Sequence, residues 1–385
     1  MWFDDALAAA LDKLDAAGRR RRIRPVAIPG PLVVLADGRQ LLDFSSNDYL
    51  GLSQHPALKA RAIEWVERFG AGSRAARLVT GTLEATAELE AKLADFKGTE
   101  AALIFNAGYQ ANAAALPALF ELAGGRDALV FTDRLNHASL HAGCAAAGVK
   151  QIRFRHNDLD HLEQLLAEHG GKPAFIVTES VFSMDGDVAD VARLGEIAKR
   201  HGAVLYVDEA HATGVLGPQG RGLATAAPGT VVMGTLGKAL GSAGAYLAGS
   251  KTLVSYLVNR CAGFIYSTAP APAALGAVDA ALDLVPDMDA QRALLRSRSD
   301  RLRTRLAELG IDTLASSTQI VPAVLGIEQA ALDAQRRLEE RGVLAIAIRP
   351  PTVPEGASRL RFALSSAHAE ADFEFLLDAV GVLKA

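Results

Sequence analysis

Cysteine is nearly absent from the chain, which has two in 385 residues, Cys144 and Cys261. Two cysteines are too few for a disulfide framework or a zinc cluster, and they suit a reducing compartment. No uninterrupted apolar run is long enough to span a membrane. The first residues carry Asp4, Asp5 and Asp12 where a signal peptide would need basic and then apolar residues. These absences predict a cytoplasmic protein without a membrane partner.

A strong excess of one charge is absent too. The chain has 40 Lys and Arg against 44 Asp and Glu, a net charge of −4. Because a chain of negative net charge has no overall attraction for nucleic acid, no nucleic-acid partner is expected. The basic run Arg19–Arg22, followed by Arg24, is an exception. A nucleic-acid arm is one reading, but a solvated helix end or an anion-binding hook suits the acidic remainder better.

Short β-rich runs alternate with helical patterns between about residues 100 and 250, such as the amphipathic stretch 188–201. Apolar strands that alternate with helices are typical of a mostly parallel sheet covered on both faces, so the fold class is α/β. The expected strands are Ala101–Phe105, Ala128–Thr132, Ala174–Thr178, Ala203–Val207, Thr230–Met233 and Ala245–Ala248.

The length of the chain favours two domains of unequal size. After Pro286 a long charged amphipathic helix (288–310) begins, followed by shorter strand-like pieces and a final helix, which predicts a smaller α+β domain. We expect a large domain over residues 46–285 and a small C-terminal domain over 286–385. Residues 1–45, which open with a helix over 3–14, are expected to pack on the small domain.

Several familiar motifs fail on their context. GAGSRA (70–75) matches the dinucleotide fingerprint, but a helical pattern and not a strand precedes it. A Walker loop around Lys238 would need glycine where Val232 stands and a hydroxyl where Ala239 stands. HASLH places His137 and His141 four residues apart but lacks a third zinc ligand, so no metal site is expected. No Gly-x-Ser-x-Gly elbow occurs.

Reactive side chains follow the expected strands. Asp208 and His211 come after one strand, Ser183 after another, and Lys238 after a third. An acid after a strand can be a simple helix cap, but ligands of open α/β sheets bind beyond the carboxyl ends of the strands. A buried lysine, an acid and a histidine together suit pyridoxal phosphate, which needs an amine and a carboxylate that keeps its ring nitrogen protonated.

The stretch FNAGYQAN (105–112) follows a strand and opens a helix. Gly108 would let the backbone approach a phosphate at the helix N-terminus, and Tyr109 offers an aromatic edge.

These residues and the motifs around them resemble the α-oxoamine synthase family of fold-type I pyridoxal-phosphate enzymes. The resemblance covers nearly the whole chain. Its motifs are FSSNDYLGLSQHP, DRLNHASLHAG, TESVFSMDGD, VDEAHATGVLGPQGRG, GTLGKALG, FIYSTAPAP and IRPPTVPEGASRLRFALSSAH. The fold it implies is a fold-type I transferase with a smaller α+β C-terminal domain.

The resemblance implies four catalytic residues. Lys238 would hold the cofactor covalently, and Asp208 would pair with its ring nitrogen. His211 would contact its phenolic oxygen, and His137 would stack on the ring and face the substrate. Ser183 would hydrogen-bond near the ring.

The resemblance also implies a phosphate site built from Gly108, Tyr109 and Thr235. Ser267 and Thr268 would reach this phosphate from a partner subunit, so a homodimer with shared active sites is implied.

Asn47 would help to fix the site, Arg349 would bind the carboxylate of the amino acid, and Thr352 and Arg21 would touch substrate. The IAIRPPTVP segment is most similar to family members that condense L-alanine with a pimeloyl thioester, on coenzyme A or a carrier protein, in biotin biosynthesis. A glycine acetyltransferase is the alternative within the family, and a nucleotide-dependent oxidoreductase is the alternative outside it.

Two departures from the family pattern stand out. Glu209 replaces a second aspartate that many relatives have, and its side chain is expected to point away from the cofactor. Residues 72–81 (GSRAARLVTG) carry more arginine than is common in relatives, which leaves the preference for the acyl donor open.

Overall fold

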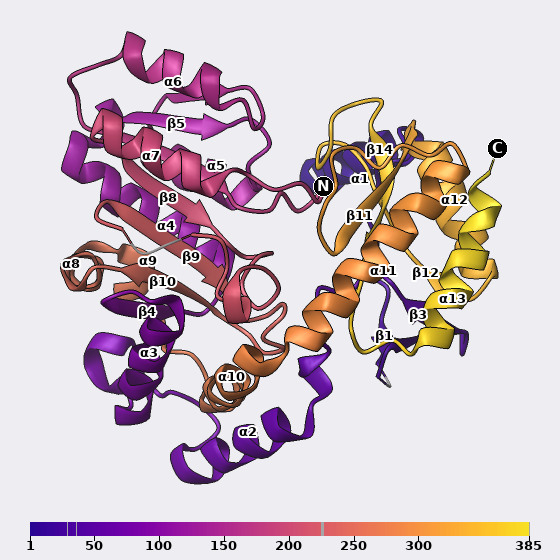
Figure 1. Cartoon of the computed structure of the whole chain (residues 1–385), viewed down its shortest axis with the longest axis horizontal. Coiled ribbons are helices and arrows are strands. Elements are labelled where there is room, and N and C mark those ends of the chain that lie inside the picture. The colour runs from indigo at the N-terminus through magenta and orange to yellow at the C-terminus, as the bar shows by residue number, and fades with distance from the viewer. Residues whose placement is uncertain (29, 36, 225–226, 385) are drawn as a thin grey trace. The chain divides into compact units, whose positions relative to one another are not determined.

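The computed structural model describes residues 1–28, 30–35, 37–224 and 227–384. The chain divides into two compact units, whose helices and strands are labelled in Figure 1. The larger unit contains Leu50–Ser183 and Val188–Arg292. The smaller unit contains Met1–Tyr49, Met184–Asp187 and Ala293–Ala385, so the start of the chain groups with its end.

A seven-stranded sheet forms the centre of the larger unit, in the order β4-β10-β9-β8-β7-β5-β6. All neighbours pair in parallel except β10, which is antiparallel to both β4 and β9. The strands are β4 (Ala101–Phe105), β5 (Leu129–Asp133), β6 (Gln151–Phe154), β7 (Ala174–Glu179), β8 (Val204–Asp208), β9 (Thr230–Thr235) and β10 (Ala245–Gly249). The six expected strands are therefore present, and β6 was not predicted.

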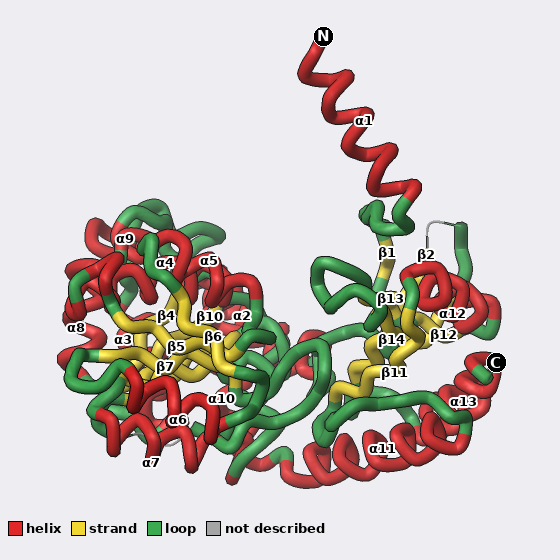
Figure 2. Tube along the Cα trace, turned by 90° about the horizontal axis from the view of Figure 1, so that it is seen from above, coloured by secondary structure: helices red, strands yellow, loops and turns green. Residues whose placement is uncertain are grey.

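Helices cover both faces of this sheet, as Figure 2 shows. Helices α4, α5, α8 and α9 share one buried apolar cluster, and α6 and α7 contribute to another on the opposite face. Alternate residues of one strand feed the two clusters: Phe175 and Val177 belong to the first, Ala174 and Ile176 to the second. This double burial explains the unbroken apolar runs. The helices are α2 (Pro56–Phe69), α3 (Glu84–Lys97), α4 (Gly108–Phe120), α5 (Ala138–Ala146), α6 (Leu159–Glu168), α7 (Val191–His201), α8 (Lys251–Arg260), α9 (Ala262–Ile265) and α10 (Pro272–Leu284).

Shorter helical turns complete the larger unit, including a π-helical turn at Arg77–Gly81. GAGSRA (70–75) lies between α2 and this turn, so no strand precedes it and the dinucleotide context is absent. The expected helix over 188–201 begins at Val191, because the Asp190 side chain caps it by accepting from the Arg193 N–H at 3.0 Å. The 3-10 turns of the chain are Leu52–Gln54, Glu121–Ala123, Gly125–Asp127, Pro218–Gly220, Val285–Asp287 and Val380–Leu383.

The smaller unit contains two sheets. One is antiparallel, in the order β11-β14-β13, and the other joins β1, β2 and β3 to β12. Its strands are β1 (Val26–Ala27), β2 (Leu32–Leu35), β3 (Gln40–Asp43), β11 (Ile320–Gly326), β12 (Val343–Leu344), β13 (Ile346–Ile348) and β14 (Ser358–Ala363). Its helices are α1 (Trp2–Ala16), α12 (Glu328–Glu340) and α13 (Glu370–Ala379), with α11 (Asp289–Glu308) beginning in the larger unit.

The N-terminal segment is attached to the smaller unit by ion pairs. Arg19 pairs with Glu328 at 2.8 Å and Arg24 pairs with Glu339 at 2.6 Å, both on α12. Helix α1 forms where it was predicted, but none of its side chains is buried. None of the helices among the described residues has the length and apolar character that crossing a membrane would require.

Candidate active site

The carboxyl ends of the parallel strands bring acidic residues together in the larger unit. Glu179 ends β7 and Asp208 ends β8, and the two residues pair in register. Asp208 also pairs in register with Met233 of β9, the strand that precedes Lys238. Asp133 ends β5 on the other side of β7. Neighbouring strands therefore deliver these residues to one edge of the sheet.

Lys238 lies in a tight turn after β9. The turn is closed by hydrogen bonds from Leu236 N–H to Gly244 O at 2.9 Å and from Gly241 N–H to Lys238 O at 2.9 Å. Gly241 has φ +64°, and a Cβ there would lie 2.5 Å from the backbone of Leu52. A side chain at 241 is therefore excluded by strain and by space. The Lys238 Nζ lies 2.8 Å from His211 Nε2.

Asp208 is a buried carboxylate held by two donors. Its Oδ1 accepts from the Ala210 N–H at 2.9 Å, and its Oδ2 accepts from the Asn112 amide at 2.8 Å. Asn112 lies on α4 and is fully buried, and its own oxygen accepts from the Tyr206 hydroxyl at 2.7 Å. Neither Asn112 nor Tyr206 was predicted as a site residue. In the sequence, Asn112 is one more residue of an expected helix and Tyr206 is one more apolar residue of an expected strand.

His137 caps α5 beside Asp208. Its backbone N–H donates to the Glu179 carboxyl, and its Nδ1 lies 2.7 Å from Ser139 Oγ. Burial lowers the pKa of His137, which Asp208 partly opposes and Lys238 reinforces. The imidazole is therefore neutral at physiological pH.

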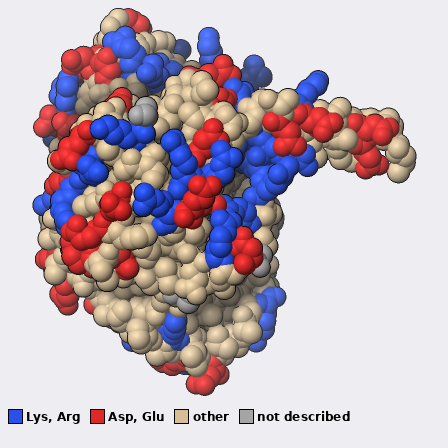
Figure 3. All heavy atoms as spheres, turned by 90° about the vertical axis from the view of Figure 1, so that its right-hand side faces the viewer, with Lys and Arg blue, Asp and Glu red and all other residues tan. Residues whose placement is uncertain are grey.

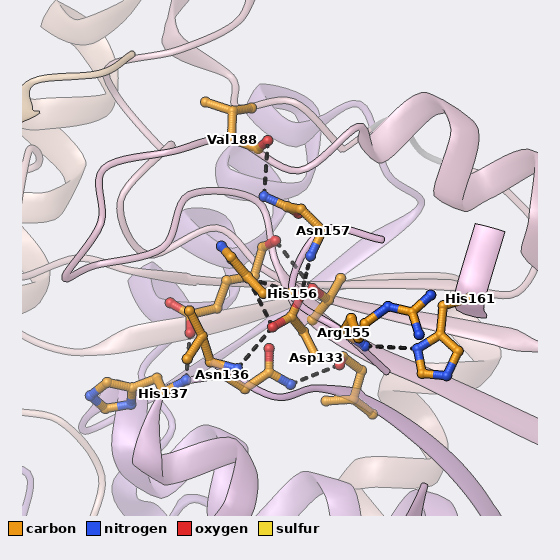
Figure 4. A network of polar contacts seen from close by, with 12 residues as sticks. Asp133, Asn136, His137, Arg155, His156, Asn157, His161 and Val188 are labelled. Atoms are coloured by element: carbon orange, nitrogen blue, oxygen red, sulfur yellow. Dashed lines mark hydrogen bonds and ion pairs between the residues drawn. The ribbon is translucent and has the colours of Figure 1, made fainter. Parts of the chain in front are cut away.

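The loop that carries His137 is fixed by Asp133, as Figure 4 shows. The buried Asp133 carboxylate accepts from the Leu135 N–H at 2.8 Å and from the Asn157 N–H at 2.9 Å, and lies 3.0 Å from His156 Nδ1. It thereby joins the loop after β5 to the loop after β6. No motif around Asp133 in the sequence indicates this role.

Glu179 is fully buried, and its environment opposes ionisation. Burial first, and then the charge of Asp208, raise the pKa of Glu179 well above its ordinary value of 4.5, while the His137 N–H and Lys238 act in the other direction. The folded chain thus retains a proton that the unfolded chain releases as the pH rises.

This proton gives a pH dependence of stability. Above about pH 4.5 the unfolded state loses the Glu179 proton first, so the free energy of unfolding falls as the pH rises toward the folded pKa. We expect Glu179→Gln, which still offers an oxygen to the His137 N–H, to lack this contribution. Melting temperatures of both proteins, measured from acid to neutral pH, should show the wild type losing stability relative to the variant. A difference independent of pH would contradict the assignment.

The N-terminus of α4 approaches the end of β9. A Cβ on Gly108 would lie 2.7 Å from the Thr235 methyl group, so glycine is required for this approach. Tyr109 is 55% exposed. Gln110 donates to Ser267 Oγ at 2.7 Å, and Asn106 donates to the Thr268 carbonyl at 2.7 Å. Ser267 and Thr268 therefore lie beside the start of α4 in their own chain.

Ser183 and Glu209, two further residues considered in the sequence, are both buried in the larger unit. Ser183 is buried beyond the end of β7. Glu209 is fully buried and turned to Lys97, whose Nζ is 2.6 Å from its carboxylate. It also accepts from the Leu223 and Ala224 N–H groups at 2.6 and 2.8 Å. Glu209 thus belongs to a structural ion pair separate from the contacts of Asp208.

Arg77, in the arginine-rich stretch 72–81, has a structural role. Arg77 is buried and forms a bidentate pair with Glu90 at 2.9–3.0 Å. Its guanidinium lies over the Phe264 ring, 5.3 Å from the centroid. The charge of Arg77 is therefore neutralised within the unit.

The predicted substrate residues of the smaller unit form a second cluster. Arg21 donates to Thr352 Oγ at 3.0 Å, and Arg349 donates to the Gly18 carbonyl. Burial and the nearby charge of Arg21 lower the pKa of Arg349, and Glu328 opposes this. Two guanidinium groups and a hydroxyl thus converge, which suits an anion.

The basic run resolves into individual roles. Figure 3 shows Lys and Arg side chains gathered at the base of the projecting N-terminal helix. Four of the five arginines of this run have a carboxylate within 4.0 Å: Arg19, Arg20, Arg22 and Arg24. Arg21 instead donates to Thr352.

Asn47, also in this unit, accepts from Arg361 and from the Tyr49 hydroxyl at 3.0–3.1 Å.

A cavity of about 720 Å³ opens at the other end of the large sheet. It is lined by the amino ends of β7, β8 and β9, including Ala174, Val204 and Thr230. It lies away from Lys238 and is not the candidate site. Among the described residues no group of three or more His, Cys, Asp or Glu is placed to hold a metal ion.

The residues around Lys238 fit pyridoxal phosphate. They supply an amine, a buried carboxylate on the adjacent strand, a neutral imidazole, and a helix N-terminus at which a glycine leaves the backbone open.

Comparisons with known proteins agree with this geometry. Residues 39–380 match the family described as aminotransferase class I and II. The chain is 60% identical to an 8-amino-7-oxononanoate synthase from Gluconacetobacter diazotrophicus, covering 98% of this chain and 96% of the relative. It is 50% identical to an 8-amino-7-oxononanoate synthase from Geobacter sulfurreducens, covering 96% and 95%.

Solved structures give the same picture. A serine palmitoyltransferase from Sphingomonas wittichii superimposes with a TM-score of 0.90 at 26% identity, covering 99% of this chain and 96% of that one. An 8-amino-7-oxononanoate synthase from Francisella tularensis gives a TM-score of 0.76 at 27% identity, covering 89% and 97%. Fold, site geometry and relatives thus agree: the chain belongs to the aminotransferase class I and II family of fold-type I enzymes and, within it, to the α-oxoamine synthases.

Proposed function

We propose that this protein is an 8-amino-7-oxononanoate synthase, which condenses L-alanine with a pimeloyl thioester and releases carbon dioxide and the free thiol. The observation that carries the proposal is 60% identity over 98% of the chain to a relative of that name. The arrangement of Lys238, His211 and Asp208 at neighbouring strand ends supports it. The cofactor is pyridoxal 5′-phosphate, and the acyl donor is carried by coenzyme A or by a carrier protein.

Each of the four predicted catalytic residues of the larger unit has a task in this reaction. Pyridoxal phosphate, when bound, draws electrons from the Cα of the amino acid. Lys238 Nζ removes the proton from that Cα and later returns one, and His211, at 2.8 Å, holds the amine in place. Asp208 supplies the negative charge that keeps a ring nitrogen protonated. His137 faces the reacting carbonyl carbon, to which the Cα forms its new bond.

The remaining predicted residues would anchor the two ends of the ligands. Gly108, Tyr109 and Thr235 would hold the cofactor phosphate at the α4 N-terminus, with Ser183 near the ring. In the smaller unit, Arg349, Arg21 and Thr352 would form a site for the carboxylate of the amino acid. Asn47 would help to fix the cofactor site.

A homodimer with shared sites is part of the proposal. Large apolar side chains are exposed on two neighbouring segments, which the bridge between Ala76 and Thr268 joins. Leu78 and Val79 are 54% and 73% exposed, and Tyr266 is 85% exposed. A second copy covering this surface would bury them and bring Ser267 and Thr268 to the partner's phosphate site.

Arg349→Lys tests the carboxylate site. Lysine keeps the charge but loses the planar fork that binds a carboxylate through two bonds. We expect the KM for L-alanine to rise roughly tenfold or more with a smaller change in kcat, since a charged hydrogen bond contributes about 1.5–3 kcal/mol. Arg20→Lys is the matched control, because Arg20 precedes Arg21 in the sequence and pairs with Asp15. An unchanged KM in Arg349→Lys would remove Arg349 from the site.

The decisive experiment is a titration of the purified holoenzyme. The cofactor absorbance is followed on adding L-alanine, glycine or serine, and product is then assayed with pimeloyl-CoA and with the pimeloyl carrier protein. We expect product with alanine and a pimeloyl thioester only. A preference for glycine and acetyl-CoA would reassign the chain to a glycine acetyltransferase. A colourless protein that binds a nicotinamide dinucleotide would overturn the class.

A further inference from the structure

A chain of buried polar side chains joins His137 to Asp208. The Tyr206 hydroxyl lies 2.7 Å from Asn112 Oδ1. Asn112 Nδ2 lies 2.8 Å from Asp208 Oδ2 and 2.9 Å from Ser139 Oγ. Ser139 Oγ lies 2.7 Å from His137 Nδ1. All but His137 are less than 5% exposed, so water does not compete for these bonds.

The chemistry of the groups sets the direction of each bond. An ionised Asp208 can only accept, so the Asn112 NH₂ group must face it, and Asn112 Oδ1 must accept from Tyr206. The second N–H of Asn112 then donates to Ser139 Oγ. Having accepted there, the Ser139 hydroxyl can donate its own proton to His137 Nδ1, 2.7 Å away.

A second donor reaches the same nitrogen. The backbone N–H of Ser139 points at His137 Nδ1 at 3.3 Å, as the cap of α5. A hydroxyl can rotate, but a backbone N–H cannot be reversed. A proton on Nδ1 would therefore face this fixed donor, but the N–H bond is long at 3.3 Å, and the Ser139 hydroxyl at 2.7 Å makes the larger contribution to keeping the proton of the neutral ring on Nε2.

The charged groups around the ring are consistent with a neutral imidazole. Burial and the charges of Lys238 and His141 disfavour the imidazolium of His137, whereas Asp208 favours it. Glu179 accepts from the backbone N–H of His137. The N-terminus of α5 adds a further positive potential at this position.

We propose that Ser139 and Asn112 are positioning residues that fix His137 in the Nε2–H tautomer. This gives the substrate side a hydrogen-bond donor and leaves proton removal to Lys238. The inference rests on the proposed function, because it assigns His137 its part in that reaction. Asn112 donates to Asp208 and to Ser139 with the same amide, so it couples the orientation of the carboxylate to that of the histidine.

The tautomer can be observed directly. In holoenzyme labelled with ¹⁵N-histidine, the two ring nitrogens of each of the nine histidines are distinguished by NMR as protonated or bare. The signals absent from a His137→Gln variant identify His137. We expect a bare Nδ1 and a protonated Nε2 in the wild type at neutral pH. A proton on Nδ1, or on both nitrogens, would overturn the proposal without any appeal to activity.

Two variants test the role of Ser139. Ser139→Ala should yield a mixture of tautomers and a kcat lower by roughly five- to tenfold, with unchanged cofactor absorbance. Ser139→Thr retains the hydroxyl and should restore the single tautomer and most of the rate. A single Nε2–H tautomer in Ser139→Ala would refute the relay. If Ser139→Ala does not fold, the wild-type and Ser139→Thr spectra still decide. Absence of product from a wild type with the expected spectrum would instead refute the proposed function.

Discussion

Replacing Lys238 with alanine is expected to abolish turnover of L-alanine and the pimeloyl thioester. The side chain has two tasks, to hold the cofactor and to carry the Cα proton, and its amine lies 2.8 Å from His211 Nε2 beyond the strand next to Asp208. A positioned general base alone contributes about 10²–10⁴-fold. The measurement is kcat by product formation, with at least about a 10³-fold loss expected.

The variant should still fold and bind cofactor reversibly. The turn around Lys238 is held by backbone hydrogen bonds of residues 236–244, which alanine retains. Reduction of the wild type with borohydride should fix the cofactor to Lys238, found by peptide mass, and fail in the variant. Lys251→Ala, an exposed lysine at the start of α8, is the matched control with unchanged activity. Near-normal turnover in Lys238→Ala would end this assignment.

The framework of the larger unit could be predicted because its strands are apolar on both faces. β7 is buried at all six of its residues and stands out in the sequence. β6 did not, because it lies at the edge of the sheet, pairs only with β5, and contains the exposed Arg153. A short edge strand with polar residues gives little signal against a loop.

The same reasoning separates the site residues that sequence could and could not identify. Asp208 and Lys238 follow strands, and the ends of parallel strands meet in space. Asn112 and Ser139 lie inside helices, and their importance comes from partners on other elements. Arg21 differs from its neighbours in its partner: Arg20 and Arg22 pair with Asp15, whereas Arg21 donates to Thr352, far along the chain. Such pairings depend on tertiary structure and leave no local pattern.

Asp208→Asn is the second large effect, and it separates charge from shape. The amide has the size of the carboxylate and can still accept from the Ala210 N–H, but its NH₂ group then faces the Asn112 amide, so that one bond is lost. It carries no negative charge, so a ring nitrogen beside it loses its proton. At about 4 Å and an effective dielectric of about 20, such a pair is worth roughly 4 kcal/mol. Since about 1.4 kcal/mol corresponds to a factor of ten, kcat should fall by about 10³-fold.

The adjacent acid provides the control that makes this result specific. Glu209→Gln removes the charge next in sequence, but that carboxylate pairs with the buried Lys97 at 2.6 Å and does not contact Asp208 or its partners. Leaving Lys97 unpaired should cost about 3–5 kcal/mol of unfolding free energy. We therefore expect Asp208→Asn to lower kcat strongly with the smaller loss of melting temperature, since one buried hydrogen bond is lost. Glu209→Gln should lower the melting temperature more, with a near-normal kcat for the folded fraction. If both variants behaved alike, charge at Asp208 would not be the property on which catalysis depends.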